Sequence, residues 1–310
     1  MIKKIFTFQD KSSQNIYAYK WFNKLNDAPN AIVIIIHGMA EHAQRYEPFA
    51  KSLVDAGYIV YANDHRGHGK TAVNAINTGY FADNKGWELV LDNIEQLKTI
   101  AIKENPNIPL FVFGHSMGSL LLRNIIFKYP NNINGIILSG TSYTPSILIN
   151  FGKTLAKLQI LFKGKKYRSK LLDKLSFGSF NKKFKPVKTP FDWLSTDASE
   201  VGKYIKDDYC GFVCTTQFFY DLFCGIQHIQ KQSNINQIPK QLPIFIICGS
   251  EDAVGNFTKG TKKVKDQLTN AGISNIKLHI YEGFRHELTN EINKSIVYKD
   301  IIEWINQINQ

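Results

Sequence analysis

The sequence is poor in cysteine and contains no long apolar run. Four cysteines in 310 residues are too few for a disulfide framework, and no Cys-X-X-Cys pair occurs, so we expect reduced, mostly buried thiols. No run of about 18 apolar residues is present, which argues against a membrane-spanning helix. The basic opening at residues 1–6 is not followed by the apolar stretch of a signal peptide. The composition therefore predicts a cytoplasmic protein.

Acidic residues are nearly missing from residues 151–190. That stretch contains twelve lysines or arginines and one acid, Asp173, and so carries +11 of the +12 net charge of the whole chain. Concentrated positive charge can attract nucleic acid, but no base-stacking motif or reading helix accompanies it. We therefore expect no nucleic-acid partner.

Six short apolar runs are typical of buried β-strands. They cover residues 32–36, 58–63, 110–113, 136–139, 243–248 and 277–281. The runs are continuous rather than alternating, as expected for parallel strands covered on both faces. Stretches with helical spacing of apolar residues lie at 49–57, 87–101, 120–126 and 292–305. The alternation predicts an α/β fold with a mostly parallel sheet and helices on both faces, and residues 1–22 indicate an antiparallel hairpin at its edge.

The pattern breaks between residues 143 and 238. This stretch is basic, aromatic and irregular, and it separates the fourth core strand from the fifth. We interpret 143–238 as a helical cap, or lid, inserted over the sheet, with 1–142 and 239–310 forming the core. Its part 146–168 mixes apolar residues with lysines. That mixture suits a helix lying on an anionic membrane surface, or a lid helix whose apolar side faces the site, and the two are compatible.

The pentapeptide Gly114-His115-Ser116-Met117-Gly118 follows a predicted strand and precedes a predicted helix. In that setting, a Gly-X-Ser-X-Gly pattern indicates a nucleophile elbow. The hydroxyl then lies near a helix N-terminus, where backbone N–H groups favour a developing negative charge. We expect Ser116 to be the nucleophile; a serine in an ordinary strand–helix turn is the alternative.

A serine nucleophile needs a base, and the base needs an orienting acid. Asp252 follows the fifth core strand and His286 follows the sixth, in the chain order that this type of site uses. The predicted catalytic residues are therefore Ser116, Asp252 and His286. Glu251 and Glu282 are rival acids, and a surface histidine capping the last helix is the alternative for His286.

Two backbone N–H groups should form an oxyanion hole. Met117 follows the nucleophile and is expected to supply one. Met39 lies in the loop after the first core strand and is expected to supply the other.

Pairs of histidines raise the question of a metal site. The nearest pairs are His37 with His42 and His65 with His68. No carboxylate or cysteine pattern accompanies them, so no metal is expected. We interpret the second loop as organised by hydrogen bonds, with an ion pair between Asp64 and Arg66. No GxGxxG or phosphate-loop pattern occurs, and no cofactor is expected.

Several segments together resemble the monoacylglycerol lipase and lysophospholipase-like branch of the α/β-hydrolases. They are His-Gly-Met-Ala-Glu-His at 37–42 with Arg45-Tyr46, Asp-His-Arg-Gly-His-Gly at 64–69, the Ser116 pentapeptide, the Asp252 and His286 loops, and cap segments 191–195 and 208–212. The similarity extends from about residue 15 to the end of the chain. It implies an α/β-hydrolase fold and a serine hydrolase that cleaves carboxylic esters of a lipid-like substrate through an acyl-enzyme.

The resemblance is less specific for substrate than for fold. The branch includes monoglyceride lipases, lysophospholipases, carboxylesterases and relatives named serine aminopeptidases. A short-chain ester or an amide bond is therefore the alternative, and the complete triad argues against a non-catalytic lipid carrier. Substrate contacts are expected at His37, Gly38 and His115, and at cap residues around Phe151, Leu155, Phe191 and Trp193. Met39 stands where relatives often carry a smaller residue.

Overall fold

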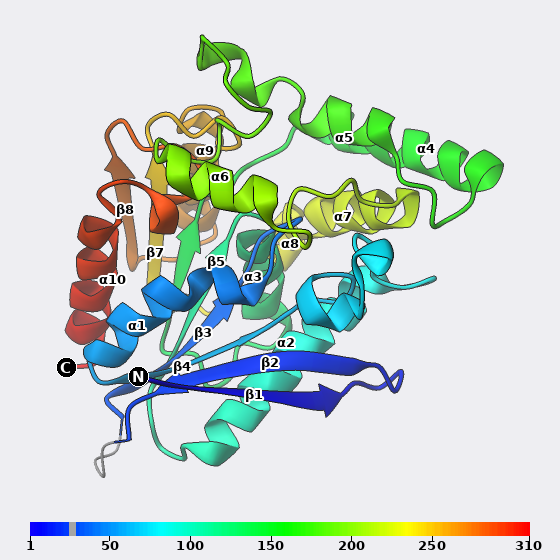
Figure 1. Cartoon of the computed structure of the whole chain (residues 1–310). Coiled ribbons are helices and arrows are strands. Elements are labelled where there is room, and N and C mark those ends of the chain that lie inside the picture. The colour runs from blue at the N-terminus through cyan, green and yellow to red at the C-terminus, as the bar shows by residue number, and fades with distance from the viewer. Residues whose placement is uncertain (25–28) are drawn as a thin grey trace.

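The computed structural model describes residues 1–24 and 29–310, and a single sheet of eight strands forms the centre of this part (Figure 1). The strand order is β1-β2-β4-β3-β5-β6-β7-β8. The strands are β1 Ile2–Gln9, β2 Asn15–Phe22, β3 Ala31–Ile36, β4 Tyr58–Asn63, β5 Leu110–His115, β6 Gly135–Ser139, β7 Ile244–Gly249 and β8 Ile276–Tyr281. The strands from β4 to β8 pair in parallel, whereas β1 and β2 form the predicted antiparallel hairpin at the edge.

The inner strands are buried along their whole length. Every residue of β3, β4, β5, β6 and β7 is buried. Burial on both faces explains why these segments are continuous apolar runs. The last strand, β8, lies at the other edge and alternates between exposed and half-buried residues over most of its length.

Helices cover both faces of the sheet. The helices outside the predicted cap are α1 Glu47–Asp55, α2 Gly86–Glu104, α3 Met117–Lys128, α9 Lys259–Asn270 and α10 Lys294–Ile308. One apolar core contains buried residues of α2, α3 and α9, and a second contains those of α1 and α10. Short 3₁₀ turns lie at Ala43–Tyr46, Gly69–Ala72, Ala75–Asn77, Phe180–Lys183 and Leu288–Asn290. The fold predicted from the sequence, a mostly parallel sheet between two helical layers, is confirmed.

Five further helices lie between β6 and β7, within residues 143–238, which we call the cap segment. They are α4 Ser146–Lys163, α5 Lys170–Phe177, α6 Ala198–Lys206, α7 Thr216–Ile229 and α8 Gln232–Ile235. In Figure 1, α4 and α5 form the outermost layer above the sheet, and α4 packs along α7. The domain boundaries at 142/143 and 238/239 stay a prediction.

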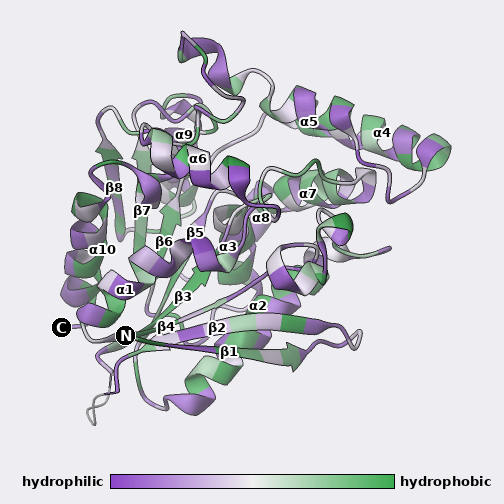
Figure 2. Ribbon diagram, viewed as in Figure 1, coloured by the Kyte–Doolittle hydropathy of each residue, from purple (hydrophilic) through white to green (hydrophobic). Residues whose placement is uncertain are grey.

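The distribution of hydropathy follows this layering. In Figure 2 the central strands are largely hydrophobic, while the helices carry both kinds of residue. None of the helices in the described part of the chain is both long enough and apolar enough to cross a membrane.

Candidate functional site

The loop between β5 and α3 holds Ser116 in an unusual backbone conformation. Its φ is 52° and its ψ is −120°, a region that side chains with a Cβ rarely adopt. The peptide is held there because the Ser116 N–H donates to the Ser139 carbonyl at 2.9 Å and the Ser119 hydroxyl donates to the Ser116 carbonyl at 2.6 Å. The serine is half-buried at the first turn of α3, the position that the sequence indicated.

Two glycines make this tight turn sterically allowed. A Cβ on Gly114 would lie 2.6 Å from the Gly118 carbonyl oxygen, and one on Gly118 would lie 2.7 Å from the His37 carbonyl oxygen. Both distances are shorter than real side chains tolerate. The pattern Gly-X-Ser-X-Gly is therefore required by the crossing of strand and helix, which is what makes it informative as a sequence motif.

His286 and Asp252 meet beyond the ends of β8 and β7. The Nδ1 of His286 lies 3.0 Å from Oδ1 of Asp252, and both side chains are almost completely buried. Asp252 also accepts the backbone N–H of Val254 at 2.9 Å and that of Gly255 at 3.2 Å. The rival acids Glu251 and Glu282 form no hydrogen bond with this imidazole in the described part of the chain.

The electrostatics of this pair suit a base and an orienting acid. Burial alone would lower the pKa of His286, but the adjacent charge of Asp252 and the hydrogen bond to it raise that pKa above its usual value. Burial alone would raise the pKa of Asp252, but His286 and the two backbone N–H donors lower it. Asp252 is therefore ionised at neutral pH, which is the state that an orienting acid requires.

The His286 ring is fixed from several sides. It lies 4.7 Å from the His115 ring and 5.5 Å from the Trp193 ring, measured between centroids. A Cβ on Gly140 would come within 2.8 Å of its Cε1. Since His115 directly precedes Ser116, these contacts bring the predicted base into the same corner as the predicted nucleophile.

Two backbone N–H groups near Ser116 are left without an acceptor. The Gly38 N–H donates to Oε1 of Glu41 at 2.6 Å and is thereby occupied. Within the described residues, the N–H groups of Met39 and Met117 have no hydrogen-bond acceptor. A Cβ on Gly38 would lie 3.2 Å from the Cβ of Ser116, so this loop runs beside the serine. The arrangement leaves free the two donors that the sequence indicated.

A buried ion network lies next to the loops of His286 and Gly38, and it was not predicted from the sequence. Arg45 donates to Glu41 at 2.6 Å and to both carboxylate oxygens of Glu287 at 2.7 Å. Burial would raise the pKa of Glu287, yet Arg45 lowers that pKa to about 2. Tyr46 adds a hydrogen bond of 2.8 Å to Glu41. The Arg45-Tyr46 pair was visible as a motif, but its partner Glu287 is 242 positions away.

The expected ion pair between Asp64 and Arg66 is wrong. Arg66 instead pairs with Asp10, from the β1–β2 turn, and its Nε donates to the Phe81 carbonyl at 2.8 Å. Asp64 accepts the backbone N–H groups of Ala43 at 2.9 Å and of Lys70 at 2.8 Å, together with the Tyr19 hydroxyl. An acid that ties together backbone segments has no need of an arginine partner.

His37 is buried inside a histidine cluster. Its Nδ1 lies 2.8 Å from the Gly38 carbonyl, and its Nε2 accepts the His65 N–H at 3.0 Å. Burial and the neighbouring His65 and His68 lower the pKa of His37. With both ring nitrogens engaged, we propose that His37 supports the loop in place of the direct substrate contact expected from the sequence.

The predicted cap contacts have different surroundings. Trp193 packs on His286, and Phe191 packs on Tyr204 at 5.0 Å between ring centroids. Leu155 is half-buried against the main core. Phe151, by contrast, is 60% exposed on α4. Of the four predicted cap contacts, Trp193 is the one that packs on His286, and Phe151 faces outward.

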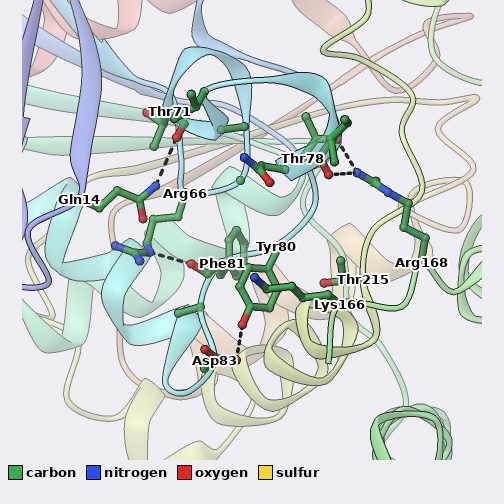
Figure 3. A pocket seen from close by; sticks show the side chains of 16 residues that line it. Gln14, Arg66, Thr71, Thr78, Tyr80, Phe81, Asp83, Lys166, Arg168 and Thr215 are labelled. Atoms are coloured by element: carbon green, nitrogen blue, oxygen red, sulfur yellow. Dashed lines mark hydrogen bonds between the residues drawn. The ribbon is translucent and has the colours of Figure 1, made fainter. Parts of the chain in front are cut away.

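A separate cavity of about 420 Å³ lies between the loop 66–83 and the cap residues Lys166, Arg168 and Thr215 (Figure 3). It is lined by Arg66, Tyr80, Lys166 and Arg168 among others, and by none of the three predicted catalytic residues. Arg168 donates to the carbonyl groups of Ile76 and Val213, each at 2.7 Å. The contact with Ile76 attaches the cap segment to the core, whereas the contact with Val213 lies within the cap segment.

The chain is similar to known lipases and esterases over most of its length. The chain is 26% identical over 278 residues to a monoacylglycerol lipase of Mycolicibacterium smegmatis, which covers 89% of this chain and 88% of that protein. It is 26% identical to the human monoglyceride lipase over 95% of this chain and 88% of that protein. A thermostable carboxyl esterase from Bacillus coagulans, solved with glycerol, superposes with a TM-score of 0.90 at 29% identity and complete coverage of both chains.

A sequence model of one family spans most of the chain. It is described as serine aminopeptidase, S33, and it matches residues 27–293. This range includes Ser116, Asp252 and His286 and the loop that carries Met39. The chain therefore belongs to the serine aminopeptidase S33 family of α/β-hydrolases.

Proposed function

We propose that this protein hydrolyses carboxylic esters of a lipid-like substrate, a monoacylglycerol or a lysophospholipid, through an acyl-enzyme intermediate. The observation that carries the proposal is the buried His286–Asp252 pair at 3.0 Å, set beside a serine with a positive φ at a helix N-terminus. The serine, the histidine and the aspartate each have a defined role in acyl transfer, and this reaction needs no cofactor.

The reaction has two balanced halves. His286 takes the hydroxyl proton of Ser116 as Oγ attacks the ester carbonyl, and then gives that proton to the departing alcohol. The N–H groups of Met39 and Met117 stabilise the oxyanion of each tetrahedral intermediate. Water then loses a proton to His286 and attacks the acyl-enzyme, which releases the fatty acid and restores Ser116. Asp252 stabilises the imidazolium in both halves.

The names of the relatives support a glycerolipid-type substrate. Two of them are called monoacylglycerol or monoglyceride lipase and cover most of this chain. A similar solved structure is titled a carboxyl esterase, which keeps a short-chain ester as the alternative. Acyl chain length distinguishes a lipid esterase from a short-chain esterase. Each methylene that the enzyme buries contributes about 0.8 kcal/mol of transfer free energy, so a lipid site should favour longer chains.

The family description points to a second candidate, cleavage of an N-terminal peptide bond. That reaction calls for a carboxylate that binds a free amine. Apart from Asp252, which is engaged by His286, the acids whose charges act on the predicted base are Glu287 and Glu41, and Arg45 pairs with both at 2.6–2.7 Å. The charge of Arg45 thus favours the ester over the peptide.

A chain-length series tests the proposal. Rates are measured on p-nitrophenyl esters from acetyl to palmitoyl, on a monoacylglycerol, on a lysophospholipid and on an aminoacyl p-nitroanilide. We expect kcat/KM to rise with acyl length and the anilide to be inert. A preference for the anilide would establish a peptidase. A maximum rate on the acetyl ester would establish a short-chain esterase. Folded protein that is inactive on every substrate would be a non-catalytic carrier.

The cap segment supports peripheral contact with an anionic membrane. On α4, Ile147, Phe151, Leu161 and Phe162 are each at least 60% exposed. Its inward side is narrow, with Ile149, Gly152 and Ala156 buried against its surroundings. Figure 2 marks α4 as a mixture of hydrophobic and hydrophilic residues on the outermost layer. Such a surface suits a helix lying in the headgroup region.

The basic residues of 151–190 strengthen that contact. In the described structure, only Lys165 of this stretch forms an ion pair, at 4.0 Å from Asp83. The other lysines therefore keep their charge available, each worth about 1 kcal/mol near an anionic leaflet. Docking through α4 would bring the cap to the lipid that supplies the substrate.

A further inference from the structure

Three metal-ligating side chains converge at the junction of the cap segment with the loop after β3. They are His42, Asp207 and Cys210, and their ligand atoms all lie within 4.8 Å of one another. His42 Nε2 is 2.8 Å from Oδ2 of Asp207. All three side chains are half-buried, so the cluster is shielded but still reaches solvent.

A tight turn after α6 holds the two cap ligands side by side. The Cys210 N–H donates to the Asp207 carbonyl at 2.9 Å, and the Tyr209 N–H donates to Oδ1 of Asp207 at 2.9 Å. The second bond fixes the carboxylate and leaves Oδ2 toward His42. The Gly211 N–H donates to the Ala40 carbonyl at 3.0 Å, which seats the turn on the loop that carries His42.

From this cluster we infer a site for a zinc-class divalent ion, bound by Nε2 of His42, Oδ2 of Asp207 and Sγ of Cys210, with water as the fourth ligand. Imidazole, carboxylate and thiolate are all ligands of Zn²⁺, and three protein ligands plus water is a common tetrahedral set. The carboxylate and the thiolate together balance the two positive charges of the ion.

The geometry needs only small adjustments. Zinc bonds of about 2.0–2.3 Å place the ligand atoms about 3.3–3.8 Å apart in a tetrahedron. The His42–Asp207 distance of 2.8 Å is below that range, and all the ligand atoms lie within 4.8 Å of one another. Binding would therefore move Nε2 of His42 and Oδ2 of Asp207 apart by roughly half an ångström or more.

Binding releases protons in a defined way. The thiol of Cys210 loses its proton to solvent as the Zn–S bond forms. The hydrogen bond between Nε2 of His42 and Asp207 is broken, and the proton on Nε2 is transferred through solvent to Nδ1, so that Nε2 can bind the ion. Zinc affinity therefore increases with pH.

Such an ion would fasten the cap segment to the core. His42 lies three residues beyond Met39, the proposed oxyanion donor, whereas Asp207 and Cys210 belong to the cap. Because the ion binds only where the two segments meet, it stabilises the folded state by mass action. In the sequence His42 was considered only with His37, and its spacing could not pair it with Asp207, which is 165 positions away.

The test uses the full-length chain without an affinity tag, reduced and freed of metal by chelation. Zinc binding is measured by competition with a chromophoric chelator, and Co²⁺ is added in parallel to detect a thiolate-to-cobalt charge-transfer band. Cys210→Ser removes the sulfur, and His42→Gln removes the imidazole while keeping a donor for Asp207. Cys224→Ser is the matched control, because Cys224 is also half-buried but lies on α7.

The expected result is one Zn²⁺ per chain, a thermal midpoint raised by zinc, and a charge-transfer band with Co²⁺. Cys210→Ser should lose the band and weaken zinc binding at least 10-fold, and His42→Gln should weaken it similarly. Cys224→Ser should match the wild type. Wild-type protein that binds no zinc, or Cys210→Ser protein that binds it as tightly as the control, overturns the inference. Ester hydrolysis by metal-free protein is independent of this outcome.

Discussion

Arg45 and Glu287 form a bidentate ion pair, and Glu287 directly follows the predicted base, His286, in the sequence. Nη1 of Arg45 lies 2.7 Å from Oε1 of Glu287, and Nη2 lies 2.7 Å from Oε2. Nη1 also contacts Glu41, which accepts the Gly38 N–H. One buried cation therefore links the loop that carries Met39, a predicted oxyanion donor, to the loop of His286.

Replacing Arg45 with Met should damage stability and catalysis together. The change leaves Glu41 and Glu287 buried without their common partner, which costs about 3–5 kcal/mol of unfolding free energy. Urea unfolding and kcat on a soluble ester measure the two effects. Lys51→Met is the control, since it removes an exposed pair with Asp55 and should cost less than about 1 kcal/mol. Equal losses in the two variants would contradict the linking role of Arg45.

The pH dependence should have an acid limb set by His286. Protonated imidazole cannot accept the Ser116 proton, so kcat/KM falls as the pH drops through the pKa of His286, which lies above its usual 6.5. Asp252→Asn removes the charge that raises this pKa. The variant should therefore titrate at lower pH, and its kcat should fall by roughly 10⁴-fold. NMR titration of the imidazole gives the pKa even where the rate is too low; an unchanged pKa would argue against Asp252 as the partner.

The strands were predictable because each apolar run is bounded by a change in composition. The predicted run at residues 58–63 coincides with β4, and that at 277–281 lies within β8 and begins one residue after its first residue. The reason is physical: strands buried on both faces tolerate no polar interruption. Helix α9 was missed because only Val264 and Leu268 give it an apolar stripe. Of the cap helices, α4 lies within the stretch 146–168 that was interpreted as a helix from the sequence, whereas α5 to α8 were not predicted individually.

The predicted catalytic residues were accessible from the sequence because loops at the ends of parallel strands meet at one edge. Long-range polar partners were not. Arg66 pairs with Asp10 rather than with its near neighbour Asp64, and Glu287 joins Arg45 across most of the chain. Side-chain pairing depends on which loops contact each other in the folded chain, and this cannot be predicted from local sequence spacing.

Gly140→Ala should displace the predicted base. The residue has φ +60°, and its Cβ would lie 2.8 Å from Cε1 and 3.0 Å from Nδ1 of His286. A ring shifted by a few tenths of an ångström or more should lower kcat by roughly 10- to 100-fold. Gly202→Ala is the control, because Gly202 lies in α6 with no atom within 4 Å of the added methyl. Its kcat should be unchanged; wild-type kcat in the Gly140 variant would show that the ring is not held by this contact.

A negative charge on the outer face of α4 should weaken membrane binding without affecting the chemistry. Leu161→Glu and Phe162→Glu each place a carboxylate where the side chain is at least 75% exposed. Co-sedimentation with vesicles containing phosphatidylserine should fall for both, while hydrolysis of a soluble short ester stays constant. Ile5→Glu makes the same change on β1, at the opposite side of the molecule in Figure 1, and should bind vesicles normally. Equal binding by all of these proteins would contradict docking through α4.

Labelling with a fluorophosphonate shows whether Ser116 is an activated nucleophile. The probe reacts with a serine only where a base and an oxyanion hole activate it. Peptide mass spectrometry of the labelled protein should find one adduct, on Ser116, and Ser116→Ala should abolish it while lowering ester hydrolysis by roughly 10⁴-fold or more. If folded wild-type protein takes up no label at Ser116, or if the Ser116→Ala variant still hydrolyses esters, Ser116 is not the nucleophile.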